Sequence, residues 1–329
     1  MENVQPLFDK FRSLKIGVIG DVMLDTYLWG EVDRISPEAP VPIVTMKKKD
    51  YRIGGAGNVA LNLQSLGVKS FVISVTGADD DAVRLGELFQ SENIDISYCF
   101  QSDLRITTNK TRIISRNQHV LRLDSEITAD LYPKEEEELL TAFESFVVNE
   151  KPDVVILEDY NKGVLTETTI RAVLDICRQN RILTAVDPKR KNFFDYKGVD
   201  IFKPNLKEVK EALNMLFQDI NPHLLQSIHS ELKQLLGHQI SFITLSEKGV
   251  FYQDNEHAGV IPSHLRAIAD VSGAGDTVIA VAAAVYAATN NVHLMAEVAN
   301  IAGGLVCEEV GTVAINREKL LHECELLLS

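Results

Sequence analysis

The chain has 329 residues, of which 45% are hydrophobic and 24% charged, so it can bury a sizeable core and is not of the disordered class. The 47 acidic residues outnumber the 33 basic ones, and the net charge of −14 argues against a non-specific nucleic-acid or anionic-membrane binder, which needs a basic field. The four cysteines are widely separated and include no CxxC pair, so the sequence suggests neither a disulfide framework nor a thiolate zinc site.

The first elements in chain order are extended. The short apolar run 15–20 predicts a buried strand. Segment 26–50 alternates apolar residues and has prolines at 37, 40 and 42, which indicates sheet-edge or lid structure rather than helix. Residues 105–124 also alternate, so we expect a β-hairpin that pairs with segment 26–50.

Helical and strand patterns follow in turn. A glycine cluster at Gly54 opens a helix with Gly67 as its C-cap, 71–77 predicts a strand, and the next helix starts near residue 80. Beyond Glu135, helices alternate with buried strands, and the last third of the chain is helical. The strands expected there are 154–159, 182–187, 201–205 and 240–246. This alternation predicts an α/β fold with a mostly parallel central sheet covered by helices on both faces.

The sequence shows no targeting or membrane segment. Its start lacks a signal-peptide core, and the most apolar stretch, 278–288, is about 11 residues and too short to span a bilayer. We therefore expect a cytoplasmic protein with no nucleic-acid or membrane partner.

The first glycine motif is Gly54-Gly55-Ala56-Gly57-Asn58. Its residue pattern matches the dinucleotide-binding fingerprint, but its context does not, because a polar segment and not a buried strand precedes it. The glycines allow close backbone approach to a ligand, and the Asn58 amide can bind hydroxyls. The alternative is a glycine-rich turn and nothing more.

The second motif, 270–276, places two glycines before a small-residue helix and ends on Asp276. Free N–H groups at a helix start form an anion site. A carboxylate beside such a site is unfavourable unless it accepts a proton, and the hydroxyl of a phosphoryl acceptor supplies one. The alternative is a helix cap.

Two weaker motifs follow strands. Asn205 and Glu208 share a face at a helix start that could hold a hydrated Mg²⁺, or form an ordinary cap. The stretch 244–249 is a nucleotide edge or a plain β-turn. Basic residues also gather locally, with Lys110 and Arg112 on one strand face, where they could hold a phosphate or remain solvated.

Together these motifs resemble the ribokinase-like (PfkB) carbohydrate kinases over nearly the whole chain. Both family signatures are present in order, at 54–60 with Gly67 and Gly77, and at 270–280. The resemblance implies a three-layer sandwich, with 1–329 as a single kinase domain and a β-lid formed by about 26–50 and 100–125. It also implies ATP and Mg²⁺ as cofactors and a homodimer formed through the lid.

Within the family, segment 20–44, which contains RISPEAPVP, is similar to the heptose 7-phosphate kinases. Further matching stretches are 52–67, 121–124, 159–165, 187–193, 203–208 and 270–280. This resemblance implies ATP-dependent phosphorylation of D-glycero-β-D-manno-heptose 7-phosphate at its anomeric oxygen, in the synthesis of ADP-heptose and the lipopolysaccharide core. We expect a stand-alone kinase, without the nucleotidyltransferase half of the bifunctional enzymes.

The resemblance also assigns roles to residues. Asp276 would be the general base, and Gly273, Ala274 and Gly275 the anion hole. Residues placed around ATP and Mg²⁺ would be Asn205, Leu206, Lys207, Glu208, Thr244, Ser246, Gly249 and Asn300, with Mg²⁺ held by Asn205 and Glu208 through water. Sugar hydroxyls would be bound by Asp25, Gly54, Gly55 and Asn58. The sugar phosphate would be held by Arg34, Lys110, Arg112 and Lys189. A K⁺ loop would map to Asp270, Ser272 and the backbone of Val306, Glu309 and Gly311, with Glu309 where the family has an arginine.

Two alternatives stay open. One is a ribose, fructose or fructose-phosphate kinase of the same family, although a neutral sugar has no use for the basic lid residues. The other is a non-catalytic sugar-phosphate sensor, although a pure binder has no use for Asp276 beside an anion hole.

Overall fold

The main sheet is mostly parallel, as predicted. The computed structural model describes residues 4–116, 118–215, 219–264 and 266–328. Within them, an eight-stranded sheet has the order β14-β13-β12-β11-β10-β9-β1-β4. Its strands are β1 (Lys15–Gly20), β4 (Lys69–Ile73), β9 (Val154–Glu158), β10 (Leu183–Asp187), β11 (Ile201–Phe202), β12 (Ile240–Thr244), β13 (Val250–Gln253) and β14 (Ala258–Ile261). Neighbours from β4 to β12 pair in parallel, whereas β13 and β14 add an antiparallel edge that the sequence analysis did not predict.

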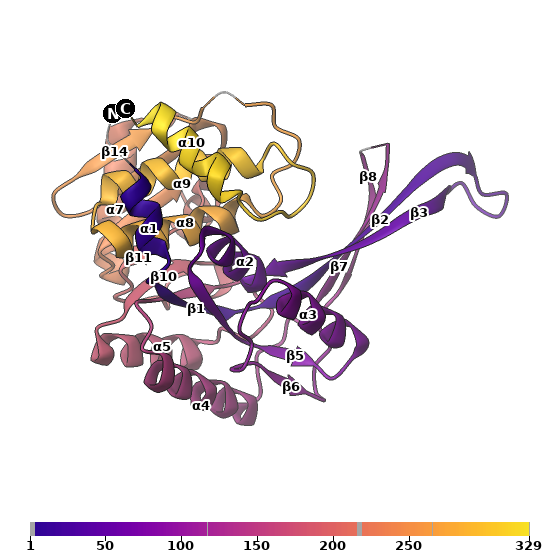
Figure 1. The fold of residues 1–329 in the computed structure, drawn as a ribbon, viewed down its shortest axis with the longest axis horizontal. Coiled ribbons are helices and arrows are strands. Elements are labelled where there is room, and N and C mark those ends of the chain that lie inside the picture. The colour runs from indigo at the N-terminus through magenta and orange to yellow at the C-terminus, as the bar shows by residue number, and fades with distance from the viewer. Residues whose placement is uncertain (1–3, 117, 216–218, 265, 329) are drawn as a thin grey trace.

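Helices cover both faces of this sheet (Figure 1). One apolar cluster joins the sheet to α1 (Gln5–Phe11), α2 (Ala56–Leu66), α8 (Ala274–Thr289), α9 (Val292–Val306) and α10 (Arg317–Leu327). A second cluster joins the other face to α4 (Pro133–Glu150), α5 (Glu167–Asn180), α6 (Leu206–Ala212) and α7 (Pro222–Leu236). Both faces of the sheet are apolar because side chains alternate along each strand. In β9, Val154 and Ile156 belong to the first cluster, and Val155 and Leu157 belong to the second. No helix of the described residues is long and apolar enough to cross a membrane.

The segments expected to form the lid make up a second sheet. In the described residues it has four strands in the order β3-β2-β7-β8, namely β2 (Val22–Ile35), β3 (Pro42–Gly55), β7 (Asn109–Ser115) and β8 (Gln118–Ser125). The β7–β8 hairpin joins β2 in parallel, which confirms the predicted pairing with segment 26–50. The β2–β3 arm projects away from the helices in Figure 1.

Two predicted boundaries were wrong. Segment 71–77 is not one strand, because it splits at Ser74 into β4 and β5 (Val75–Gly77). Strand β5 pairs with β6 (Phe100–Ser102) in a separate two-stranded sheet, so residues 100–102 do not join the lid sheet. Helix α3 (Asp80–Ser91) follows β5 as expected, capped by the Asp79 side chain, which accepts from the N–H of Ala82.

The strand order fixes where a ligand can bind. From β1 the chain passes to β4 on one side, and it returns later as β9 on the other side. Where the direction reverses, a crevice forms beyond the carboxyl ends of the two adjacent strands, β1 and β9, and α/β proteins bind their ligands there. Here those ends are Gly20 and Glu158, which pair in register.

A histidine pair away from this edge predicts how stability depends on pH. His229 Nδ1 and His238 Nε2 lie 2.8 Å and 2.6 Å from the Ser241 hydroxyl. Burial lowers the pKa of His229 to about 4 and that of His238 to about 3. Below pH 6.5 the unfolded chain therefore binds more protons than the folded one, and stability falls as the pH drops toward these folded values.

We expect the free energy of unfolding to decrease by up to about 1.4 kcal/mol per pH unit for each histidine between pH 6 and pH 4.5. Urea unfolding of wild type and His238→Gln, which keeps a partner for Ser241 but does not titrate, measures the difference. The exposed His257→Gln variant is the control. Equal pH slopes in all three proteins would contradict the prediction.

Candidate active site

The structure holds Asp276 at the start of α8, aimed by two hydrogen bonds. Asn58 Nδ2 donates to Asp276 Oδ2 at 2.7 Å, and the Tyr160 hydroxyl donates to Oδ1 at 2.7 Å. The side chain is buried, with 3% of the residue exposed. Burial raises the Asp276 pKa to about 6, against the two hydrogen bonds, which lower it. A carboxylate poised in this range suits a general base working near neutral pH.

Asn58, expected to bind sugar hydroxyls, also contacts the expected base. Its Nδ2 donates to Asp276 Oδ2 and so orients that carboxylate. Asn62 supports it from one turn further along α2, since its Nδ2 donates to the Asn58 carbonyl at 2.8 Å.

The expected anion hole lies beside the base. Gly273 caps α8 in the left-handed region, at φ +78°. The N–H of Ala274 donates to the Val271 carbonyl at 3.3 Å, so it is partly occupied. Within the described chain, the N–H groups of Gly273 and Gly275 have no partner and remain available to an anion.

Gly273 cannot be enlarged without disturbing the base. A Cβ there would lie 2.8 Å from Asn58 Nδ2, and the left-handed φ adds strain. We expect Gly273→Ala to lower kcat about 10- to 100-fold, because misplacing a catalytic group by about 1 Å has effects of this size.

Steady-state kinetics would measure this loss. The matched control is Gly86→Ala in α3, where nothing lies within 4 Å of the new Cβ, so activity should be unchanged. Wild-type kcat in Gly273→Ala would show that the Asn58 contact does not orient Asp276.

Carboxylates and lysines gather at the ends of β9 and β10. Asp187, at the end of β10, forms ion pairs with Lys203 Nζ at 2.7 Å and with Lys189 Nζ at 3.0 Å. Burial alone would raise the Asp187 pKa, but the two lysines hold it below its usual value. Glu158 is fully buried, and neither of its carboxylate oxygens has a partner in the described residues. Carboxylate oxygens of Glu158, Asp187 and Asp276 lie within 4.8 Å of one another. Burial, together with the charges of Asp187 and Asp276, raises the Glu158 pKa well above its usual value.

Asn205 and Glu208, the expected Mg²⁺ pair, are hydrogen-bonded to each other. The N–H of Glu208 donates to Asn205 Oδ1 at 2.9 Å, and the N–H of Asn205 donates to Glu208 Oε2 at 2.7 Å, forming a capping box. Glu208 Oε1 also accepts from Lys189 at 3.0 Å. The hard oxygen donors suit Mg²⁺, and their existing partners favour contact through water rather than direct coordination.

The residues expected around the nucleotide gather on the same edge. Asn205 and Thr244 form an isolated parallel bridge between the ends of β11 and β12. Gly249 approaches the 261–263 backbone so closely that a Cβ would meet the Ile261 carbonyl at 2.0 Å. Asn300 Nδ2 donates to the Pro262 carbonyl at 2.9 Å, which places α9 beside this turn. Ser246 lies within the turn, and Leu206 and Lys207 open α6, with the Lys207 side chain largely exposed.

The expected sugar residues meet on β2, β3 and β7. Arg112 Nη1 donates to Asp25 Oδ1 at 2.6 Å, so the two residues form a buried ion pair. Gly54 lies against Asp25, where a Cβ would come within 2.9 Å of Oδ2. Gly55, at φ +60°, packs on the Asp21 carbonyl. Lys110 has no carboxylate within ion-pair distance in the described chain, and burial lowers its pKa.

Arg34 is not brought to this site. It lies near the outer end of β2, opposite Ile43, nine residues along the strand from Asp25. At about 3.3 Å per residue this is roughly 30 Å. The sequence pattern placed Arg34 with Lys110 and Arg112 because it could not show how far the arm extends. Lys189 Nζ pairs with the Asp187 and Glu208 carboxylates, and it lies near the same Tyr160 ring as Lys110 Nζ.

Asp270 and Ser272, expected at the K⁺ loop, lie together. Ser272 donates from its N–H and its hydroxyl to Asp270 Oδ1, at 3.0 Å and 2.9 Å, and the Gly311 N–H donates to Oδ2 at 2.9 Å. Burial would raise the Asp270 pKa, but these hydrogen bonds lower it, so the loop carries a fixed negative charge. Of the backbone groups assigned to the loop, the Val306 carbonyl already accepts the Glu309 N–H at 3.2 Å.

Sequence reasoning missed several residues of the site, among them Asp21, Glu158 and Tyr160. Asp21 directly follows β1, Glu158 ends β9, and Tyr160 lies two residues beyond that end. Tyr160 lies in the 159–165 stretch that carried part of the resemblance, and its position next to an expected strand end was the available signal.

Comparison with known sequences identifies relatives. Residues 13–319 match the pfkB family carbohydrate kinase. The bifunctional protein HldE of Methylobacillus flagellatus is 39% identical over 308 residues, covering 94% of this chain and 62% of that protein. The bifunctional protein HldE of Trichlorobacter lovleyi is 36% identical over 324 residues, covering 98% and 65%. The chain thus spans less than two thirds of the length of these relatives.

Solved structures share the fold. A crystal structure of phosphofructokinase-2 from Escherichia coli in complex with potassium gives a TM-score of 0.81 at 16% identity, covering 96% of this chain and 100% of the other. Ribokinase from Arabidopsis thaliana, complexed with ribose and ATP, gives 0.72 at 15% identity, covering 94% and 98%. At such identities the likeness establishes the architecture alone, which is the three-layer arrangement predicted from the sequence.

Proposed function

The chain belongs to the pfkB family of carbohydrate kinases, and from this premise we propose that it phosphorylates D-glycero-β-D-manno-heptose 7-phosphate at the anomeric oxygen. The products would be the 1,7-bisphosphate and ADP. The observation that carries the proposal is the buried Asp276 carboxylate, oriented by Asn58 beside free N–H groups at the start of α8. A sugar-phosphate sensor would not need a base there.

The mechanism is transfer by positioning and electrostatics. Asp276 accepts the proton of the anomeric hydroxyl while the sugar oxygen attacks the γ-phosphorus, and the bond to the β–γ bridging oxygen breaks. The N–H groups of Gly273 and Gly275, reinforced by the α8 dipole, stabilise the charge on the transferred phosphoryl group.

ATP and Mg²⁺ fit the nucleotide side of the site. The edge built from Asn205, Thr244, Gly249 and Asn300 would hold the nucleotide. Glu208 would hold Mg²⁺ through water, and the ion would neutralise phosphate charge. Lys189 has a raised pKa in spite of its burial, because Asp187 and Glu208 face it, so it is a fixed cation for the phosphates.

The heptose 7-phosphate assignment rests on the lid sheet. Lys110 and Arg112 lie on one face of β7, which pairs with β2 at Asp25 and Tyr27. A cation with no ion-pair partner beside the expected sugar site suits an anionic acceptor rather than a neutral sugar. The RISPEAPVP stretch occupies the end of β2 and the turn to β3, and it carries the resemblance to the heptose kinases.

Three further proposals complete this function. The fixed charge of Asp270 fits K⁺ as an activating cation beside the anion hole. Leu121 and Leu123 on β8 are 52% and 53% exposed, and a second copy packing on the lid would cover them. We also infer a role in the cytoplasmic synthesis of ADP-heptose for lipopolysaccharide.

The test is ADP release by the purified protein with Mg²⁺ and ATP. Parallel reactions contain D-glycero-D-manno-heptose 7-phosphate, fructose 6-phosphate, ribose or fructose. Turnover with the heptose phosphate alone is the expected result. Preference for another sugar would overturn the substrate assignment, and ATP binding without any turnover would favour the sensor.

A further inference from the structure

The Tyr160 hydroxyl lies against the carboxylate that we propose as the base. Its hydroxyl donates to Asp276 Oδ1 at 2.7 Å, while Asn58 holds Oδ2. The acceptor sugar must place its own hydroxyl on this carboxylate for its proton to be removed. Without a sugar, the oxygen of the base that Asn58 leaves free is therefore capped by a phenol.

The phenol can cap the base but cannot replace it. Burial and the neighbouring Asp276 charge raise the Tyr160 pKa well above its usual value, so the hydroxyl stays protonated and acts as a donor. Two cations lie near its ring, Lys110 Nζ at 4.9 Å and Lys189 Nζ at 5.6 Å from the ring centroid. Tyr160 thus contacts both an expected sugar-phosphate residue and a cation paired with Glu208.

The loop that carries Tyr160 is held firmly from β1. The buried Asp21 carboxylate accepts the N–H groups of Tyr160, Lys162 and Val164 at 2.9, 3.0 and 3.1 Å. Three backbone bonds to one carboxylate fix the path of the loop and the position of the Tyr160 backbone, while the side chain can still rotate.

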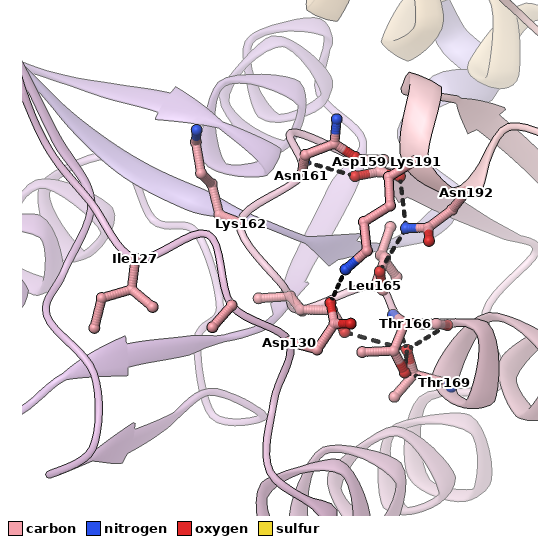
Figure 2. A network of polar contacts seen from close by, with 12 residues as sticks. Ile127, Asp130, Asp159, Asn161, Lys162, Leu165, Thr166, Thr169, Lys191 and Asn192 are labelled. Carbon is pink, nitrogen blue, oxygen red and sulfur yellow. Dashed lines mark hydrogen bonds and ion pairs between the residues drawn. The ribbon is translucent and has the colours of Figure 1, made fainter. Parts of the chain in front are cut away.

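The far side of the loop is held as well (Figure 2). Asp159 accepts the Asn161 N–H at 2.7 Å and Asn192 Nδ2 at 3.2 Å, and Asn192 Nδ2 also donates to the Leu165 carbonyl at 2.7 Å. The backbone around Tyr160 is therefore held both by Asp21 and by the Asp159–Asn192 contacts.

We propose that Tyr160 is a positioning residue that caps Asp276 until the acceptor sugar displaces it, and so suppresses the transfer of phosphate to water. The proposal rests on the proposed function, in which Asp276 is the base. In the suppressed reaction a water oxygen would bond to the γ-phosphorus, and the bond to the bridging oxygen would break to release ADP. The water proton would pass to Asp276 and then to solvent.

The test is ATP hydrolysis by Tyr160→Phe in the absence of sugar. This change removes only the hydroxyl, and we expect hydrolysis to rise about 10-fold because water gains access to the base. The acceptor KM should fall, since no hydroxyl has to be displaced, whereas a merely structural defect would raise KM and lower kcat. Tyr286→Phe, at the other end of α8, is the matched control with wild-type behaviour.

Further variants separate the possible results. In Tyr160→Phe combined with Asp276→Asn, the added hydrolysis should disappear, and Tyr160→Leu should repeat the rise if the phenylalanine variant folds poorly. Unchanged hydrolysis in both Tyr160 variants of a protein that phosphorylates a sugar would overturn the cap and leave the kinase assignment intact. A rise that depends on Asp276, in a protein inactive on heptose 7-phosphate, would support the cap and refute that substrate.

Discussion

Replacement of Asp276 by asparagine should lower kcat about 100- to 10,000-fold, the range that a general base contributes. The amide has the same shape and can still pair with Asn58 or Tyr160, but it cannot take a proton. The KM for ATP should change little, because Asp276 contacts neither Asn205 nor the 244–249 turn among the described contacts.

The same residue predicts the pH dependence of activity. With a pKa raised to about 6, mainly by burial, Asp276 is ionised above that pH and protonated below it. Since only the ionised form accepts a proton, kcat/KM for the sugar should fall as the pH drops through about 6.

Steady-state kinetics of Asp276→Asn, and of the wild type across a range of pH, check these two predictions. A steady-state comparison with Asp175→Asn, an exposed carboxylate of α5 paired with Arg178, controls for the loss of one charge. Circular dichroism and ATP binding confirm that the variant is folded. Turnover within a few fold of wild type in Asp276→Asn would remove Asp276 from the role of base.

Replacement of Lys110 by methionine should raise the KM for the sugar phosphate about 10- to 100-fold. This corresponds to the loss of one charge-assisted contact of about 1.5–3 kcal/mol. Lys110 is chosen over Arg112 because removing Arg112 leaves Asp25 as an unpaired buried charge, which would damage the fold as well as binding. The KM for ATP should stay constant.

Initial rates at varied sugar phosphate and varied ATP distinguish the two substrates. Lys48→Met serves as control, because it removes an equally charged, exposed side chain from the same sheet. If Lys110→Met instead raised the KM for ATP and left that for the sugar phosphate unchanged, the lysine would belong to the nucleotide side.

The fold could be predicted from local patterns. Apolar runs such as 15–20 and 154–159 identify buried strands because a parallel sheet covered on both faces needs hydrophobic residues throughout. The antiparallel edge β13–β14 was missed, and 71–77 was read as one strand. Both depend on which neighbour a strand finds, and hydrophobic periodicity does not contain that information.

The family, the expected base and the expected anion hole came from the sequence, because their chemistry lies in contiguous motifs. The Asp276 carboxylate and the glycines before it are neighbours in the chain, so one helix start is enough to bring them together.

Only the tertiary structure decided which distant residues meet. It brought Asn58 and Tyr160 onto Asp276, from positions 218 and 116 residues away, and paired Arg112 with Asp25. It also kept Arg34 away on the extended arm. The physical reason is that the ends of β1, β9 and β10 converge at one edge of the sheet through strand pairing and helix packing, which act between segments and not within them.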